Sequence, residues 1–191
     1  FDYVMELKPD ALQLGFLKIL NGTKMQEFAK ENGWKWQEKS VYEVFSTPYM
    51  SFEDISFLKD IELLVDEFWN KKIFSNTMKF IFRKISPWKF FSLLCKFAQE
   101  KKSFDASRKD LYWFNLLNEF FNDNFLSEYK FVLKDLIKYD FVLTGKKGNF
   151  PDWYEHRYDK EKHRLLLEQN GMLHSTRLAF AMTEFETFDF D

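Results

Sequence analysis

Few residues in this sequence are of the types that perform catalysis or bind metals. The three histidines are His156, His163 and His174. Neither an HExxH spacing nor a set of cysteine partners accompanies them, so the sequence predicts no zinc site. From the residues alone we expect the histidines to lie at the surface. The sequence also lacks a glycine-rich phosphate loop and a GxSxG nucleophile motif.

The acidic pair closest to an aromatic residue is Asp152 and Glu155, which flank Trp153. Two carboxyl groups beside a tryptophan could act as acid and base if they shared a pocket. Alternatively, they decorate an exposed loop, because the glycines and the proline of GKKGNFPDW at 145–153 predict a surface loop.

The single cysteine excludes an intrachain disulfide and any cluster held by several thiolates of this chain alone. Cys95 lies in KFFSLLCKFAQE, on the apolar side of an expected helix. We therefore predict a buried, unreactive thiol.

Composition restricts the class of protein further. Of the 191 residues 46% are hydrophobic and 20% aromatic, including 25 Phe, which excludes a disordered chain. The net charge of −2 gives no sign of nucleic-acid binding. No apolar run reaches the roughly 20 residues of a membrane span, so we expect no membrane partner and a cytoplasmic protein. Because position 1 is Phe, we expect a cut or processed piece.

The pattern of elements predicts a mainly α fold: a bundle of about five to seven helices with short β-strands at the N- and C-terminal ends. Near the N-terminus, the alternation in residues 12–16 predicts a strand entered at Pro9. Thr23 is a predicted N-cap for a short helix that Gly33 stops. Residues 34–36 and 42–46 are either a small hairpin or an extended connector.

Helix starts are the clearest local signals. Ser51 and Asp54 form a predicted capping box for a helix over residues 52–71, and Ser86 followed by Pro87 begins another. Further helices are expected over 76–84, from about Ser107 and from about Ser127. The expected inner faces are Leu58, Ile61, Leu64, Val65, Phe68 and Trp69; Trp88, Phe91, Leu94, Cys95 and Ala98; Leu111, Phe114, Leu117 and Phe121; and Phe131, Leu133, Leu136 and Ile137.

The C-terminal part changes character twice. Residues 159–171 predict a charged helix with Gly171 just after its end. Residues 178–190 alternate again and predict a strand, with a phase conflict at 184–186 that indicates a bulge.

The order of motifs resembles the C-terminal part of cobalamin-binding radical SAM proteins. The similar segments are PDALQLGFLKILNGTKM, a short helix ending in glycine, and YEVFSTPYMSFEDISFLKDIELLVDEFWN, which holds Glu62, Val65, Glu67, Phe68 and Asn70. Phe1, Asp2 and Val4 resemble the run into the last barrel strand. The helices that follow resemble a C-terminal domain of unknown function, and DWYEHRYDKEKHR and FETFDFD are similar to its tail.

This resemblance implies two parts. Residues 1–33 would be the remnant of the last barrel strand and helix, and residues 34–191 a helical accessory domain. The implied parent enzyme binds cobalamin and cleaves S-adenosylmethionine at a four-iron four-sulfur cluster held by a CxxxCxxC motif. Because that motif is absent here, we expect this chain to be non-catalytic, without a cofactor or metal of its own.

The resemblance also suggests where the chain would meet its parent. Barrel active sites lie at the carboxyl ends of the strands, so Gln13, Gly15, Lys18 and Asn21 would stand at the rim of the cavity. There the domain would bind substrate or dock onto the enzyme. The alternative is that these residues simply complete a strand end and a turn.

The expected partners are the chain's own radical SAM and cobalamin-binding domains. Without the barrel, we expect residues 12–16 to pack against segment 34–46, against the C-terminal strand, or against the strand edge of a second copy in a homodimer. The alternative function is a free-standing helical protein-interaction module.

Overall fold

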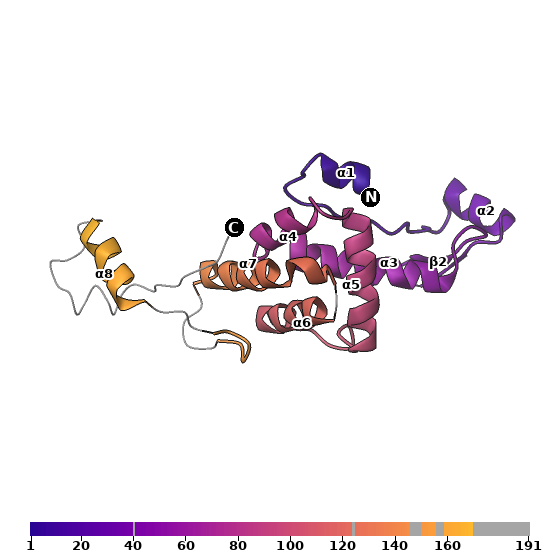
Figure 1. The fold of residues 1–191 in the computed structure, drawn as a ribbon. Helices are drawn as coiled ribbons and strands as arrows, with labels where there is room; N and C mark the ends of the chain where they lie inside the picture. The colour runs from indigo at the N-terminus through magenta and orange to yellow at the C-terminus, as the bar shows by residue number, and fades with distance from the viewer. Residues whose placement is uncertain (40, 124, 146–149, 156–158, 170–191) are drawn as a thin grey trace.

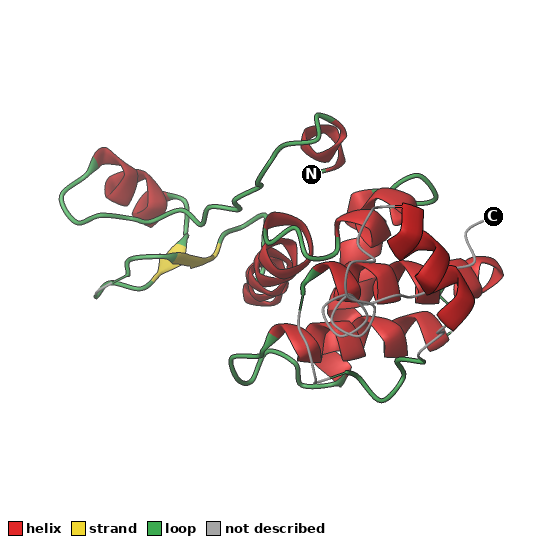
Figure 2. Cartoon of the chain, turned by 90° about the vertical axis from the view of Figure 1, so that its left-hand side faces the viewer, coloured by secondary structure: helices red, strands yellow, loops and turns green. Residues whose placement is uncertain are grey.

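The computed structural model describes residues 1–39, 41–123, 125–145, 150–155 and 159–169, which form a mainly α structure (Figures 1 and 2). The elements in these ranges are α1 (Asp2–Glu6), α2 (Lys24–Glu31), β1 (Lys35–Trp36), β2 (Val44–Ser46), α3 (Phe52–Val65), a π-helical turn η1 (Asp66–Asn70), α4 (Ser75–Ile81), α5 (Pro87–Glu100), α6 (Asp110–Asn122), a 3₁₀ turn η2 (Ser127–Tyr129), α7 (Lys130–Leu143) and α8 (Lys160–Gln169). The predicted fold class is confirmed.

Helices α3 to α7 form the body of the molecule, in which α5 runs across the ends of α6 and α7 (Figure 1). Aromatic side chains fill its core. Phe74 lies between Phe68 and Phe114, at centroid distances of 4.7 and 4.3 Å, and Phe68 also meets the edge of Trp113. Such rings bury large apolar areas, so the body needs no disulfide for stability.

A smaller unit, the arm (residues 16–50), lies at the N-terminal end of α3 (Figure 1). It has its own apolar cluster, made of Ile19, Ala29, Val44 and Ile55. β1 and β2 pair antiparallel across an irregular register, so the hairpin interpretation is confirmed. This cluster joins residues on both sides of position 33, and the boundary expected between residues 1–33 and 34–191 stays a prediction.

The prediction that residues 12–16 form a β-strand is wrong, because this segment pairs with no other strand among the described residues. The segment is extended and its side chains alternate, with Leu12, Leu14 and Phe16 half-buried, but it belongs to no strand. Pairing begins just after it, because Ile19 N–H donates to Tyr42 O and Val44 N–H donates to Leu17 O. Within residues 12–16, only Phe16 packs on the cluster that contains Val44 of segment 34–46, whereas Leu12 and Leu14 pack on the core of the body.

The extreme N-terminus also differs from the expectation. Asp2 and Val4 belong to α1 rather than to a run into a strand. The Asp2 carboxylate accepts a hydrogen bond from the Trp88 backbone N–H (2.6 Å), and Phe1 packs on Trp88 and Phe91. These contacts fix α1 to the start of α5.

The predicted caps of three helices are confirmed. The side chains of Thr23, Ser51 and Ser86 each accept a hydrogen bond from the backbone N–H three residues later. In addition, the Asp54 carboxylate accepts a hydrogen bond from the Ser51 backbone N–H. Helix bounds follow closely, although α6 begins at Asp110 rather than near Ser107.

Two residues expected in the core are exposed. Trp88 is 38% exposed and Phe131 is 85% exposed, whereas Phe90, which the pattern left out, is fully buried. Trp88 occupies the first turn of α5, where the rings of Phe1 and Phe57 pack against it. At the start of α7 the core-facing positions are instead those of Leu133 and Ile137.

The predicted charged helix is confirmed as α8, while Gly171 and the predicted strand at 178–190 lie outside the described residues. In the part of the chain that the structure describes, no helix combines the length and the apolar character needed to cross a membrane.

Candidate functional site

Two side chains at the end of η1 hold the extended N-terminal segment. The Asn70 amide forms two hydrogen bonds with the Leu12 backbone: its Oδ1 accepts from Leu12 N–H (2.9 Å) and its Nδ2 donates to Leu12 O (3.0 Å). The adjacent Trp69 Nε1 donates to Pro9 O (3.1 Å). The Asn70 amide therefore satisfies both the N–H and the C=O of Leu12, as the backbone of a neighbouring β-strand would.

The π-helical turn positions these side chains. The Lys71 N–H donates to Asp66 O (3.1 Å), a bond from residue i+5 to residue i. The turn follows α3 directly, and it points Phe68 into the core while Asn70 faces the N-terminal segment. Short π-helical turns of this kind occur frequently at functional sites.

A groove of about 570 Å³ runs between the N-terminal segment and α3. Glu62, Asp66 and Asn70 give its helical wall a polar and mainly acidic character, and Gln13 stands on the opposite wall. The complete lining is Ala11, Leu12, Gln13, Lys59, Glu62, Leu63, Asp66 and Asn70. We take this groove, named the η1 groove, as the candidate functional site.

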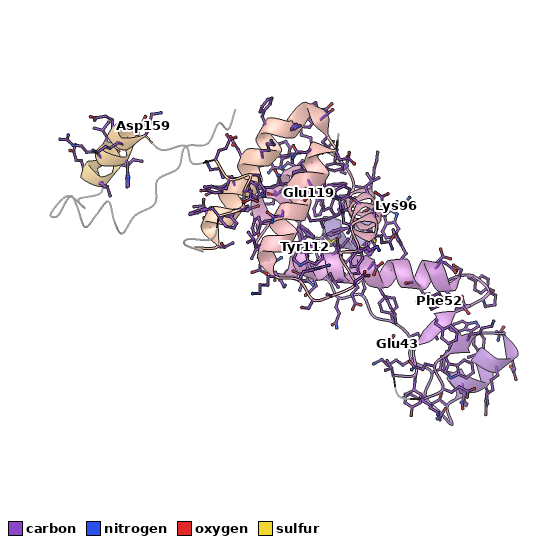
Figure 3. All side chains as sticks on the ribbon, turned by 90° about the horizontal axis from the view of Figure 1, so that it is seen from below. Glu43, Phe52, Lys96, Tyr112, Glu119 and Asp159 are labelled. Atoms are coloured by element: carbon purple, nitrogen blue, oxygen red, sulfur yellow. The ribbon has the colours of Figure 1, made fainter. Side chains whose placement is uncertain are left out.

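At one end of the η1 groove, the side chain of Lys59 forms an ion pair with the arm. The Lys59 ammonium pairs with the Glu43 carboxylate at 2.5 Å and lies over the Phe16 ring, 5.4 Å from its centroid. Because Glu43 precedes β2, this pair ties the hairpin to α3, and Figure 3 shows Glu43 on the arm near Phe52, the first residue of that helix.

Lys71, the residue after η1, meets acidic side chains. Burial by itself would lower the pKa of Lys71, but the hydrogen bond with Glu67 and the negative charges of Glu67, Asp110 and Asp66 outweigh it, so the pKa is raised.

The chemistry available in the η1 groove is hydrogen bonding and charge rather than nucleophilic attack. Its lining offers amides, carboxylates and one ammonium, with no cysteine, serine or histidine. Across the described ranges, no group of three or more His, Cys, Asp and Glu side chains is arranged to hold a metal ion.

Of the four predicted rim residues, only Gln13 lines the η1 groove. Gly15 and Lys18 are exposed further along the segment, and Lys18 forms an isolated bridge with Glu43. Asn21 accepts a hydrogen bond from Gln26 Nε2 (3.0 Å) in the turn before α2. The structure thus does not gather the four residues, and for Asn21 it supports the interpretation as a turn residue.

The two acids around Trp153 do not share a pocket: Glu155 lines a small cavity of about 60 Å³ with Trp153, and Asp152 is not among its lining residues. Asp152 and Glu155 are both exposed. Trp153 donates to Asn115 Oδ1 (2.9 Å), and the buried Lys138 donates to the backbone oxygen of Glu155 (2.5 Å). These contacts attach the segment to the helices, which favours loop decoration over a shared acid–base pocket.

The remaining residues with reactive side chains are Cys95 and the histidines, and the expectations for their burial have different outcomes. Cys95 is fully buried as predicted, and burial, assisted by the charge of Asp60, raises the pKa of its thiol to about 12. His163 is also buried, so the expectation of a surface position is wrong for this residue. His156 and His174 lie outside the described residues.

Sequence reasoning missed the role of Asn70, although it named this residue within a motif. The available signal was a Trp–Asn pair at the end of a helix, where tryptophan N–H and amide groups can bind a passing backbone.

The chain belongs to the family described as protein of unknown function (DUF4080), whose model matches residues 30–190. No curated protein and no solved structure was found to match the sequence. The helical wall of the η1 groove lies within the matched range, whereas residues 11–13 precede it.

Proposed function

We propose that this chain is a non-catalytic C-terminal domain of a cobalamin-dependent radical SAM enzyme, and that it docks onto the preceding barrel through its extended N-terminal segment. One observation carries the proposal. Residues 12–16 are held extended from both ends, by Asn70 at Leu12 and by segment 42–44 at residues 17–19. Within the described chain, the backbone groups of residues 13–16 have no hydrogen-bond partner.

An extended segment with free backbone groups is a template for pairing with another sheet. One side of the segment is covered by this chain, because Leu12 and Leu14 pack on the core of the body and Phe16 packs on the cluster of the arm. The opposite side, with Gln13 and Gly15, is exposed. The preordered segment would therefore join a barrel edge at a low cost in conformational entropy.

The η1 groove would then lie beside the active-site cavity of the barrel. Gln13 would stand where strand ends meet the active-site rim, and the Asn70 amide would hold the segment in place. There the domain would border the cavity and contact substrate. The cluster, the cobalamin and S-adenosylmethionine would belong to the preceding domains, because one cysteine cannot supply three thiolate ligands. In this proposal the protein works in the cytoplasm.

A second candidate is the free-standing interaction module, which a different observation favours. Tyr49 of the arm is 90% exposed, and the exposed Phe45 of the arm meets the exposed Phe52 of α3 edge to face at a centroid distance of 6.4 Å. Exposed aromatic side chains gathered in this way mark protein-binding surfaces.

The two candidates are separated by the gene. We expect the reading frame to encode a CxxxCxxC motif ahead of Phe1, and the full-length product, purified without oxygen, to show cluster and cobalamin absorption and to cleave S-adenosylmethionine. A start codon immediately before Phe1, or a full-length product without these spectra, would contradict the docking proposal and leave the interaction module.

A further inference from the structure

Helix α5 carries an outward face that the η1 groove does not involve. Its outward residues are spaced so that they lie on one side of the helix, and Figure 3 shows Lys96 on the outer side of α5. They are Lys89, Leu93, Lys96, Phe97 and Glu100.

This face borders an open groove of about 440 Å³, the α5 groove. The opposite wall comes from the end of α6 and the loop after it. Phe120, Phe125 and Leu126 make that wall apolar, and Asp123 stands at its edge. On α5 itself Leu93 is 39% exposed, so the floor of the groove presents apolar surface to water.

The two end positions of this face carry opposite charges. Lys89 lies in the first turn of α5 and Glu100 at its last residue, while Lys96 lies one turn before Glu100. Asp123 stands near the same end, because its charge acts on Lys101.

Within the described chain, Lys89, Lys96 and Glu100 form no ion pair, whereas the adjacent Lys101 pairs with Glu119 at 2.8 Å. Lys89 therefore leaves an unmatched positive charge at one end of the face, and Glu100 an unmatched negative charge at the other.

We propose that the α5 groove is the interface with a second copy of this chain, with the two α5 helices packed antiparallel about a two-fold axis. In that arrangement Lys89 of one copy faces Glu100 of the other, and Leu93 faces the aliphatic stem of Lys96. Each pair occurs twice because the interface is isologous. A parallel pairing would place like charges together.

A second copy explains this surface better than an unrelated peptide. Lys89 and Glu100 stand at opposite ends of the face, with Leu93 and Lys96 between them, so reversing one copy places each end charge opposite its counterpart. The helix dipoles of two antiparallel helices also oppose each other favourably. This interface uses α5 rather than the strand edges expected from the sequence, and it does not depend on the proposed function.

Sedimentation of the chain up to about 200 μM tests the proposal. The variants are Lys89→Glu, Glu100→Lys and the double reversal, with Lys79→Glu as a matched control, since Lys79 is an exposed lysine on α4 outside the groove. We expect a dimer for the wild type, at least about tenfold weaker dimerisation for each single reversal, and recovery in the double variant. Circular dichroism verifies folding.

A wild type that stays monomeric would overturn the proposal. So would single reversals that weaken the dimer no more than Lys79→Glu does, or a double reversal that fails to restore it.

Discussion

The Asp140 carboxylate of α7 caps the start of α4 through Thr77, 63 residues away in sequence. Its Oδ2 accepts from both the Thr77 backbone N–H (2.8 Å) and the Thr77 hydroxyl (2.7 Å). Its Oδ1 accepts from the backbone N–H and the side-chain amide of Asn76. The N-cap residue of α4, Phe74, has no acceptor of its own, so a buried carboxylate from another helix performs the capping.

Replacing Asp140 should be costly. Asp140→Ala leaves the buried donors of Thr77 without an acceptor, so we expect the free energy of unfolding to fall by about 3 kcal/mol. Urea denaturation measures the change. Asp105→Ala, at an exposed aspartate, is the control and should stay within about 0.5 kcal/mol of the wild type. Equal midpoints for the two variants would refute a capping role for Asp140.

Removing the Asn70 amide should release the N-terminal segment without unfolding the body. For Asn70→Ala we expect a loss of about 1–2 kcal/mol, because two hydrogen bonds to the Leu12 backbone disappear. Hydrogen exchange at Leu12 should accelerate more than exchange in α6. Asn122→Ala, at an exposed position, is the matched control. Unchanged exchange at Leu12 would show that Asn70 does not hold the segment.

The Ser51 capping box should be visible in the titration of Asp54. Hydrogen bonds from the Ser51 backbone N–H, and then from its hydroxyl, lower the pKa of Asp54 below 3.8. Ser51→Ala removes only the hydroxyl, so NMR titration should show the Asp54 pKa moving toward 3.8 while staying below it.

The sign of the pH dependence follows from this direction. A carboxyl group with a lower pKa in the folded state stabilises the fold above its unfolded pKa, and the effect is lost as the pH falls through the folded pKa. The difference in unfolding free energy between the wild type and Asp54→Ala should therefore shrink below about pH 3.8. A difference that grows on acidification would contradict the assigned bonds.

Cys95 should be unreactive in the folded protein. Since burial raises the pKa of its thiol to about 12, almost no thiolate exists at pH 8. We expect a thiol reagent such as 5,5′-dithiobis(2-nitrobenzoate) to modify it only as fast as the protein unfolds, and rapidly in denaturant. Fast modification under native conditions would show that the thiol is accessible.

Features that depend on residues three or four positions apart could be predicted from the sequence. The caps at Thr23, Ser51 and Ser86 are of this kind, because the side-chain acceptor and the backbone donor belong to the same turn. The apolar spacing likewise predicted the buried faces around Leu64 and Leu117.

Contacts between distant segments could not be predicted in this way. Nothing near Asn70 identifies Leu12 as its partner, since 58 residues separate them. The spacing predicts a core position for Trp88, but this residue stands in the first turn of α5 and remains partly exposed. For the candidate site, Gln13 was named in advance, whereas the acidic wall opposite it depends on how α3 and the N-terminal segment meet.

The most direct test of the docking proposal is hydrogen exchange at residues 13–16, compared between this chain alone and the full-length gene product. In the chain alone these amides have no described partner and should exchange quickly. In the full-length protein, pairing with the barrel should slow them at least about 100-fold. Equally fast exchange in both proteins would contradict the claim that this segment joins the chain to an enzyme.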